Sequence, residues 1–134
     1  MKSIDTIEGI GPSYQEKLAA AGVETVEALL EKAGAKKGRT ALAEATGISE
    51  KMILTWVNMA DLFRVKGVAG QYAELLVAAG VDTVKELAQR NPESLHAKMV
   101  EANEAKNVAR QVPAEKSVAG WIAEAKSLPQ AVTH

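Results

Sequence analysis

Apolar residues recur along this chain at the spacing of α-helices. Tyr14, Leu18 and Ala21 stand at positions i, i+4 and i+7, which is one face of a helix with 3.6 residues per turn. The same spacing returns from Tyr72 to Ala79. Alternating apolar and polar runs, which would indicate half-buried strands, are missing. The pattern therefore predicts an all-α protein.

The chain contains an internal repeat. Residues 7–32, IEGIGPSYQEKLAAAGVETVEALLEK, return as residues 65–90, VKGVAGQYAELLVAAGVDTVKELAQR. The stretches around Trp56 and Trp121 match as well, and the second copy carries extra residues that we expect between Glu101 and Pro113. A self-match of this density indicates one supersecondary unit built twice. We predict units at residues 1–64 and 65–134, with the two tryptophans buried at equivalent places.

Residues that begin or end helices stand at matching places in the two copies. Pro12 suits a first helical position, because that residue needs no N–H partner inside the helix. Gly22 and Gly80 suit the left-handed conformation that commonly ends a helix. Hydroxyl side chains can accept a hydrogen bond from the first turn of the following helix, and the candidates for this N-cap role are Thr25, Thr40, Ser49 and Thr83.

The segment from Ser49 to Arg64 is apolar over a wide part of its helical surface. Its stripe comprises Ile53, Trp56, Val57, Ala60 and Phe63, widened by Met52, Met59 and Leu62. A helix with so broad an apolar surface must be covered on more than one side. No Gly/Ser/Pro linker separates it from residue 65, so we predict two units packed together around a shared long central helix.

Composition narrows the class of protein. Apolar residues make up 47% of the chain and charged residues 25%, and no apolar run approaches the length of about 20 residues that crosses a bilayer. The N-terminus lacks the apolar core of a signal peptide, and there are no cysteines. We expect a soluble, cytoplasmic protein. With 16 basic and 17 acidic residues the net charge is −1, which gives no strong electrostatic footprint for nucleic acid or membrane.

The glycines of the first copy carry a resemblance. The stretch from Ile7 to Pro12, followed by Tyr14, Leu18 and the helix end at Gly22, resembles the helix-hairpin-helix motif of nucleic-acid-binding proteins. The continuation AGVETVEALLE resembles the C-terminal domain of the bacterial RNA polymerase alpha subunit, a SAM-like helical fold. From residue 4 to residue 129 the chain is similar to a prokaryotic family of tandem helix-hairpin-helix proteins of unknown function. The resemblance implies two tandem SAM-like units and DNA-backbone binding, and hairpins of this kind sometimes hold a monovalent cation.

The first hairpin has the chemistry to hold a phosphate. A Gly-hydrophobic-Gly turn that leads into a helix leaves backbone N–H groups without partners, and the helix dipole adds attraction for an anion. Gly9, Gly11 and Ser13 would supply these donors, with Lys17 on the helix that follows. The same glycines are also what a tight connection between two packed helices requires, whatever the outer surface binds.

The second hairpin departs from this pattern. It contains Gly67, but Ala69 stands where the first copy has Gly11, and the added methyl would hinder a phosphate. Arg64 and Lys66 flank the turn and could compensate. Few cations lie near either hairpin, so we expect binding to be weak and to be lost at modest salt.

Residues 40–57 also fit a helix-turn-helix pattern, with Gly47 in the turn. The densest basic cluster of the chain, Lys36, Lys37 and Arg39, precedes it. These cations could touch phosphates, or they could simply solvate a loop. Residues 49–58 would present one cation to a major groove, and two helices packed through small residues produce the same pattern, so base-specific recognition is the weaker interpretation.

Catalytic signals are missing from the sequence. The two histidines lack metal-ligand spacing, the serines lack a glycine elbow, and no phosphate loop with its lysine is present. We therefore predict a protein that is not an enzyme and has no metal or cofactor. Its expected role is weak, sequence-independent binding of nucleic-acid backbone, nominally duplex DNA, through the first hairpin. The alternative is a protein-protein adaptor, favoured by the neutral charge and the Met-rich helix; no membrane partner is expected.

Overall fold

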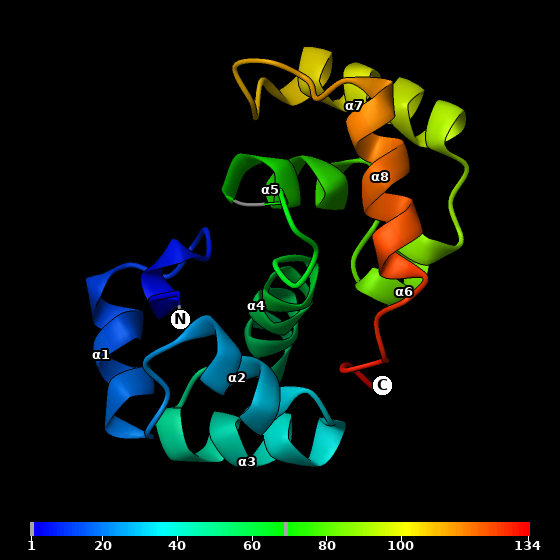
Figure 1. The fold of residues 1–134 in the computed structure, drawn as a ribbon. Coiled ribbons are helices and arrows are strands. Elements are labelled where there is room, and N and C mark those ends of the chain that lie inside the picture. The colour runs from blue at the N-terminus through cyan, green and yellow to red at the C-terminus, as the bar shows by residue number, and fades with distance from the viewer. Residues whose placement is uncertain (1, 69) are drawn as a thin grey trace. The chain divides into compact units, whose positions relative to one another are not determined.

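A computed structural model describes residues 2–68 and 70–134, and these residues form helices, turns and loops without a β-strand. The predicted all-α class is confirmed (Figure 1). In chain order the elements are the 3-10 helix η1 (Ile4–Thr6) and the α-helices α1 (Pro12–Ala20), α2 (Val26–Ala33), α3 (Lys36–Thr46), α4 (Glu50–Leu62), α5 (Gly70–Ala78), α6 (Val84–Ala88), α7 (Pro92–Lys106) and α8 (Glu115–Ala125). Among the described helices, none is long and apolar enough to traverse a lipid bilayer.

The chain divides into two compact units. Unit 1 comprises Met1–Asp61 together with Ala131–His134, and unit 2 comprises Leu62–Gln130. The division falls at the end of α4, a few residues before the boundary that the repeat suggests. The sequence placed residues 131–134 with the second copy, whereas the structure places them with unit 1.

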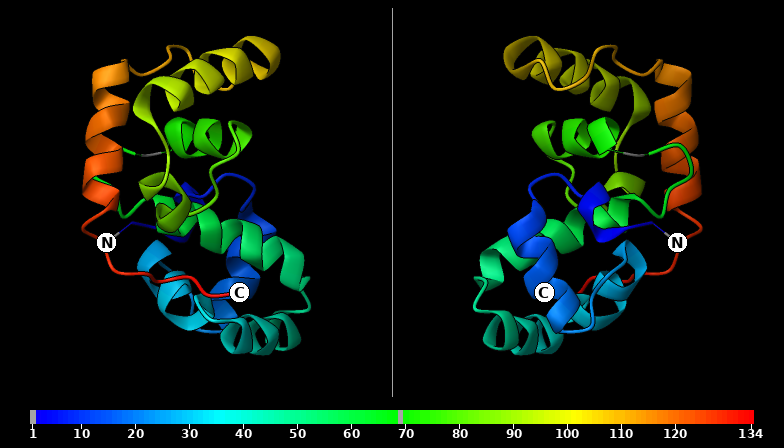
Figure 2. Two further views of the ribbon diagram at one scale, coloured as in Figure 1. Left: turned by 90° about the vertical axis from the view of Figure 1, so that its right-hand side faces the viewer. Right: turned by 90° about the vertical axis from the view of Figure 1, so that its left-hand side faces the viewer.

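The tail 131–134 is bound to unit 1 by backbone and side-chain contacts (Figure 2). The Thr133 N–H donates to the Gly34 carbonyl at 2.9 Å, and Val132 is buried. The Arg39 guanidinium donates to the Thr133 carbonyl at 2.6 Å. Only glycine fits at position 34, because a Cβ there would overlap the carbonyl oxygens of Ala131 and Leu30.

In unit 1, helix α2 packs against α3, and α1 contacts both η1 and α3. The buried core includes Leu18, Leu29 and Leu42. Gly38 lies in α3 where that helix meets the end of α2, and a Cβ at this position would overlap the Lys32 carbonyl oxygen. The glycine inside the basic cluster is therefore required by close helix packing.

The two helix caps predicted in this region, at Ser49 and Thr40, have different outcomes. Ser49 caps α4 as predicted, since its Oγ accepts from the Met52 N–H at 3.2 Å. The predicted cap at Thr40 is wrong, because α3 already begins at Lys36 and Thr40 lies inside it. The Thr40 hydroxyl bonds to the Lys36 carbonyl and the Glu50 carboxylate instead. The basic cluster that resembled a loop thus forms the first turn of α3.

Unit 2 packs α8 against α6 and α7, and α5 against α7 (Figure 1). The extra residues of the second copy are divided between a longer helix and a longer loop, within the predicted range. Helix α7 has 15 residues where α3 has 11. It ends at Asn107 in the left-handed conformation, and the loop 107–114 follows. The Asn103 side chain ties this loop down with two hydrogen bonds to the Ala109 backbone, at 2.8 and 3.0 Å.

Matching backbone hydrogen bonds occur in the two units. The Ile7 N–H donates to Ile4 and the Val65 N–H donates to Leu62, at 3.2 and 3.1 Å. After α1 and α5, Gly22 and Gly80 adopt φ values of 85° and 95°, as predicted for helix ends. Thr25 and Thr83 cap α2 and α6, confirming two further predictions. The repeated sequence therefore builds the same local backbone in each unit.

Candidate functional site

The first hairpin is the turn between η1 and α1. Gly9 adopts a φ of 96°, a left-handed value that side chains other than glycine rarely accept. Gly11 is extended and forms the N-cap of α1, with no side-chain hydrogen bond capping the helix. Pro12 takes the first helical position, as the sequence predicts. The turn thus brings glycines and the start of a helix to one place.

The predicted donors of this hairpin are accessible. Gly9, Gly11 and Ser13 are exposed, and their backbone N–H groups have no hydrogen-bond partner among the described residues. A Cβ built on Gly11 would meet nothing within 4 Å. The backbone at Gly11 is therefore open to a ligand, and any larger side chain there would stand in open space.

A buried tryptophan supports the same turn from within unit 1. Trp56 of α4 is only 3% exposed, and its Nε1 lies 3.5 Å from the place that a Cβ of Gly9 would occupy. The Tyr14 ring packs edge-on against the indole, with ring centroids 5.2 Å apart. The indole N–H has no hydrogen-bond partner among the described residues. The indole therefore places a side-chain N–H beside the backbone N–H groups of the hairpin.

The predicted cations of unit 1 fall into two groups. Lys17 lies over the Tyr14 ring, with its Nζ 5.8 Å from the ring centroid, and Lys36 and Lys37 are exposed at the start of α3. Arg39 differs, because it is 4% exposed and donates to the carbonyls of Ala33, Gly34 and Thr133. Its guanidinium holds parts of unit 1 together.

A cavity of about 390 Å³ adjoins this basic cluster. Its lining comprises Lys36, Arg39, Glu50, Lys51, Leu54 and His134. Cations outnumber carboxylate side chains in this lining, so the cavity wall is favourable to an anion. The structure brings Lys51, the one cation of residues 49–58, to the predicted cluster.

The second hairpin repeats the left-handed glycine of the first, with different surroundings. Gly67 adopts a φ of 91°, and the Trp121 Nε1 lies 3.1 Å from the place of its absent Cβ. The Tyr72 ring packs on Trp121 at 5.5 Å between centroids, and Trp121 is 7% exposed, which confirms its predicted burial. Ala69, whose methyl the sequence suggested as an obstacle, lies outside the described residues.

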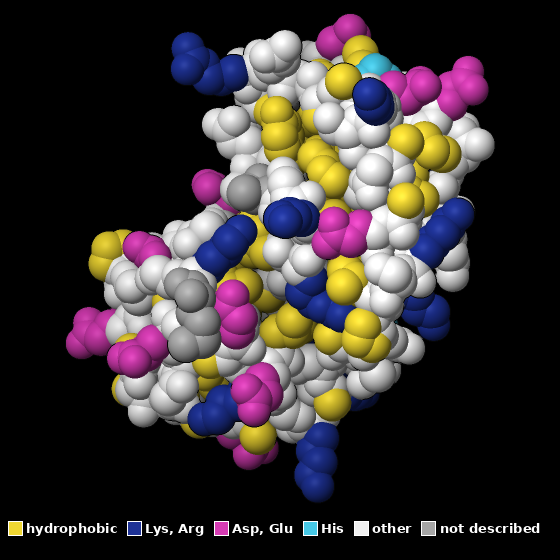
Figure 3. All heavy atoms as spheres, in the orientation of Figure 1, with side chains coloured by type: hydrophobic (Ala, Val, Ile, Leu, Met, Phe, Trp, Pro, Cys, Tyr) yellow, Lys and Arg dark blue, Asp and Glu magenta, His cyan; other side chains and the backbone are white. Residues whose placement is uncertain are grey.

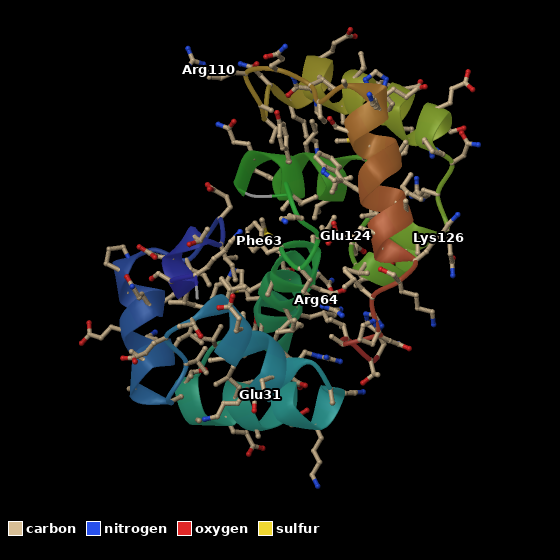
Figure 4. All side chains as sticks on the ribbon, in the orientation of Figure 1. Glu31, Phe63, Arg64, Arg110, Glu124 and Lys126 are labelled. Atoms are coloured by element: carbon tan, nitrogen blue, oxygen red, sulfur yellow. The ribbon has the colours of Figure 1, made fainter. Side chains whose placement is uncertain are left out.

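The cations predicted at the second hairpin are accompanied by an acidic side chain. The backbone N–H of Lys66 donates to the Glu124 carboxylate at 3.0 Å, and the Arg64 guanidinium donates to the Pro129 carbonyl at 2.5 Å. Figure 4 shows Glu124 on α8 and Arg64 in the segment after α4. In unit 2, a carboxylate of the chain itself thus accepts the hydrogen bond from one backbone N–H of the hairpin.

Charged side chains of both signs are interspersed on the visible face of the molecule (Figure 3). This distribution agrees with the net charge of −1. Within residues 2–68 and 70–134, no group of three or more His, Cys, Asp or Glu side chains could hold a metal ion.

The sequence missed the side chains that distinguish the two hairpins. Glu124 stands where the first copy has Met59, and Ser117 stands where it has Met52. Both differences are visible once residues 49–60 and 114–125 are aligned on the tryptophans. Whether these two differences affect the hairpin depends on how far each side chain lies from it, and helical spacing alone does not give that distance.

Comparison with known proteins places the chain in one family. No curated protein and no solved structure matches it. The family described as "Domain of unknown function (DUF4332)" matches residues 8–128. This match covers both hairpins, both Tyr–Trp pairs and the loop 107–114. The chain belongs to the DUF4332 family.

Proposed function

We propose that this protein is a non-catalytic binding module that holds nucleic-acid backbone, without base preference, through the first hairpin. The observation that carries the proposal is the combination of N–H donors at this turn. The exposed amides of Gly9, Gly11 and Ser13 have no partner among the described residues, and the Trp56 N–H beside Gly9 has none either.

A phosphate oxygen suits these donors for chemical reasons. Amides at a helix N-terminus carry partial positive charge and attract anions, and hydrogen bonds from N–H groups to charged oxygens are stronger than those to neutral ones. Gly11 leaves the approach open, because a Cβ there would meet no neighbour within 4 Å. Backbone contacts of this kind position a nucleic acid but do not distinguish its bases.

The expected affinity is low. Lys17, Lys36 and Lys37 are the exposed cations of unit 1 among the predicted contacts, and the net charge of the chain is −1. Each phosphate contact releases counterions, so a protein with about two or three contacts shows a shallow dependence of affinity on salt. Measurements must therefore begin at low ionic strength.

The test is a fluorescence-anisotropy titration of a labelled duplex with wild type and Gly11→Val. Wild type should bind at about 50 mM salt and weaken as salt rises. Gly11→Val should weaken binding by about tenfold or more, since it obstructs charge-assisted hydrogen bonds worth over 1 kcal/mol. The fold should survive, because the φ of Gly11 is −86° and its surroundings are open.

Gly120→Val is the matched control. Gly120 lies in α8 of unit 2, and a Cβ there would also meet nothing within 4 Å. This variant should bind as wild type does. A folded wild type that fails to bind at low salt, or a Gly11→Val that binds normally, would overturn the proposal and leave the protein-protein adaptor as the better interpretation.

A further inference from the structure

Unit 2 contains a cavity of about 330 Å³ directly beside its hairpin. Its walls come from the hairpin and α5, from the loop 107–114 and from α8; the lining residues are Gly67, Tyr72, Gln111, Val112, Pro113, Ala114, Ser117 and Trp121. All of these residues belong to unit 2. The volume is at the lower end of the range for small-molecule sites, about 300–1,000 Å³.

The difference between the two copies explains part of this space. In unit 1, Met52 lies against Tyr14, with the tyrosine hydroxyl 3.8 Å from the Met52 sulfur. The position that matches Met52 in the second copy is Ser117, a much smaller residue that lines the cavity together with Tyr72. The loop 107–114 contributes the opposite wall and is itself fixed by Asn103.

The polar groups of the cavity are neutral and available. The Trp121 N–H, the Tyr72 hydroxyl, the Ser117 hydroxyl and the Gln111 amide have no hydrogen-bond partner among the described residues. The indole belongs to a side chain that is over nine-tenths buried, which holds this donor in place at the cavity wall.

The remaining lining defines the class of ligand. No lining side chain carries a formal charge, which disfavours an ion as the bound group. Val112, Pro113 and the two aromatic rings offer apolar surface, and aromatic side chains favour planar partners. A neutral, planar heteroaromatic ring with hydrogen-bond acceptors at its edge satisfies both requirements.

We propose that this cavity binds a nucleobase. The base would contact the Tyr72 and Trp121 rings and accept a hydrogen bond from the indole N–H. It would exchange further hydrogen bonds with the Tyr72 hydroxyl, the Ser117 hydroxyl and the Gln111 amide. Stacking on aromatic side chains is sequence-tolerant, because every base has a π-face. The site is separate from the first hairpin, and it accepts a base either from a free nucleoside or from an unpaired single strand.

Trp121 supplies the probe for a direct test. In the full-length variant Trp56→Phe, Trp121 is the one tryptophan left in the sequence, and its fluorescence is followed during titration with adenosine, thymidine, ribose and a short single-stranded oligonucleotide. We expect a saturable change with the nucleosides and none with ribose. Saturation at lower concentration by the oligonucleotide identifies a strand as the source of the base, and preference for the nucleoside identifies the free ligand.

The decisive variant is Ser117→Met in this background, which restores the residue that unit 1 carries at the matching position. It should raise the dissociation constant at least about tenfold, equivalent to about 1.4 kcal/mol, because the methionine side chain fills the cavity. Ala123→Met is the matched control, since Ala123 is exposed on α8 and does not line the cavity. Tyr72→Phe removes one hydroxyl and serves as a second variant if Ser117→Met misfolds.

No saturable change with any base, or an equal response in Ser117→Met or Tyr72→Phe, would overturn the nucleobase proposal. The result is distinguishable from failure of the proposed backbone binding. Gly11→Val should weaken duplex binding while leaving the Trp121 response to nucleosides intact, because Gly11 belongs to unit 1 and the cavity to unit 2.

Discussion

The two hairpins share a left-handed glycine and a supporting indole but have different surroundings. Each has a glycine in the left-handed region against a tryptophan Nε1, and each tryptophan packs on a tyrosine. At the first hairpin Gly11 is open. At the second hairpin, the Glu124 carboxylate accepts a hydrogen bond from the Lys66 backbone N–H. The loop 107–114 lines a cavity beside Gly67. The repeated turn is therefore surrounded by different chemical groups in the two units.

The largest effect should come from the glycines that touch the indoles. Gly67→Ala should lower the free energy of unfolding by about 2 kcal/mol, because alanine is strained at positive φ and its Cβ would lie 3.1 Å from the Trp121 Nε1. Gly9→Ala should cost less, about 1 kcal/mol, since the corresponding distance is 3.5 Å. Chemical denaturation measures both values.

Gly11→Ala is the control for this pair, because its φ is negative and its Cβ would meet no neighbour. It should change stability by less than about 0.5 kcal/mol. Equal effects at Gly9, Gly11 and Gly67 would show that contact with the indole does not decide the need for glycine.

A second change tests whether the acidic side chain of unit 2 matters. Glu124→Met introduces the residue of the first copy and removes the hydrogen bond to the Lys66 N–H. We expect a loss of about 1 kcal/mol of stability, the usual net contribution of such a bond. Thermal unfolding of this variant is compared with that of Glu101→Met, which alters an exposed glutamate of α7 and should be nearly neutral.

If Glu124→Met were no less stable than Glu101→Met, the carboxylate would have no structural role at the second hairpin. Among the described residues, the cavity would then be the only difference in surroundings between the two hairpins that has a consequence.

The smallest difference in stability between matching variants of the two units is expected at the helix caps. Thr25→Ala should destabilise by about 1 kcal/mol, because it removes the acceptor for the Ala28 N–H at 3.0 Å. Thr83→Ala should cost about half as much, since its bond to the Glu86 N–H is longer, at 3.4 Å. Equilibrium unfolding in urea distinguishes the two, and a larger loss at Thr83 would contradict the order.

Local signals in the sequence predicted much of this backbone. Pro12, Gly22 and Thr25 act within a few residues of their own positions, so their roles follow from residue type and spacing alone. The repeat then extended each local prediction to the second copy. Thr40 shows the limit, because Lys36 begins the helix earlier than the hydroxyl suggested.

Contacts between distant residues could not be predicted in this way. Lys36, Lys37 and Arg39 formed one basic cluster in the sequence, but burial separates Arg39 from the two lysines. Its partner Thr133 is 94 residues away, and no periodicity connects the two. The sequence also does not show that the Lys32 carbonyl lies against Gly38.

The return of residues 131–134 to unit 1 has a consequence for synthesis. Most of unit 1 is made before unit 2, but Thr133 is made only after it. The Thr133 carbonyl accepts a hydrogen bond from Arg39, and the Thr133 N–H donates to the Gly34 carbonyl. Domains commonly fold in the order in which they are translated. Here unit 1 stays incomplete until residues 131–134 have been made, so it reaches its final state only after unit 2 has been synthesised.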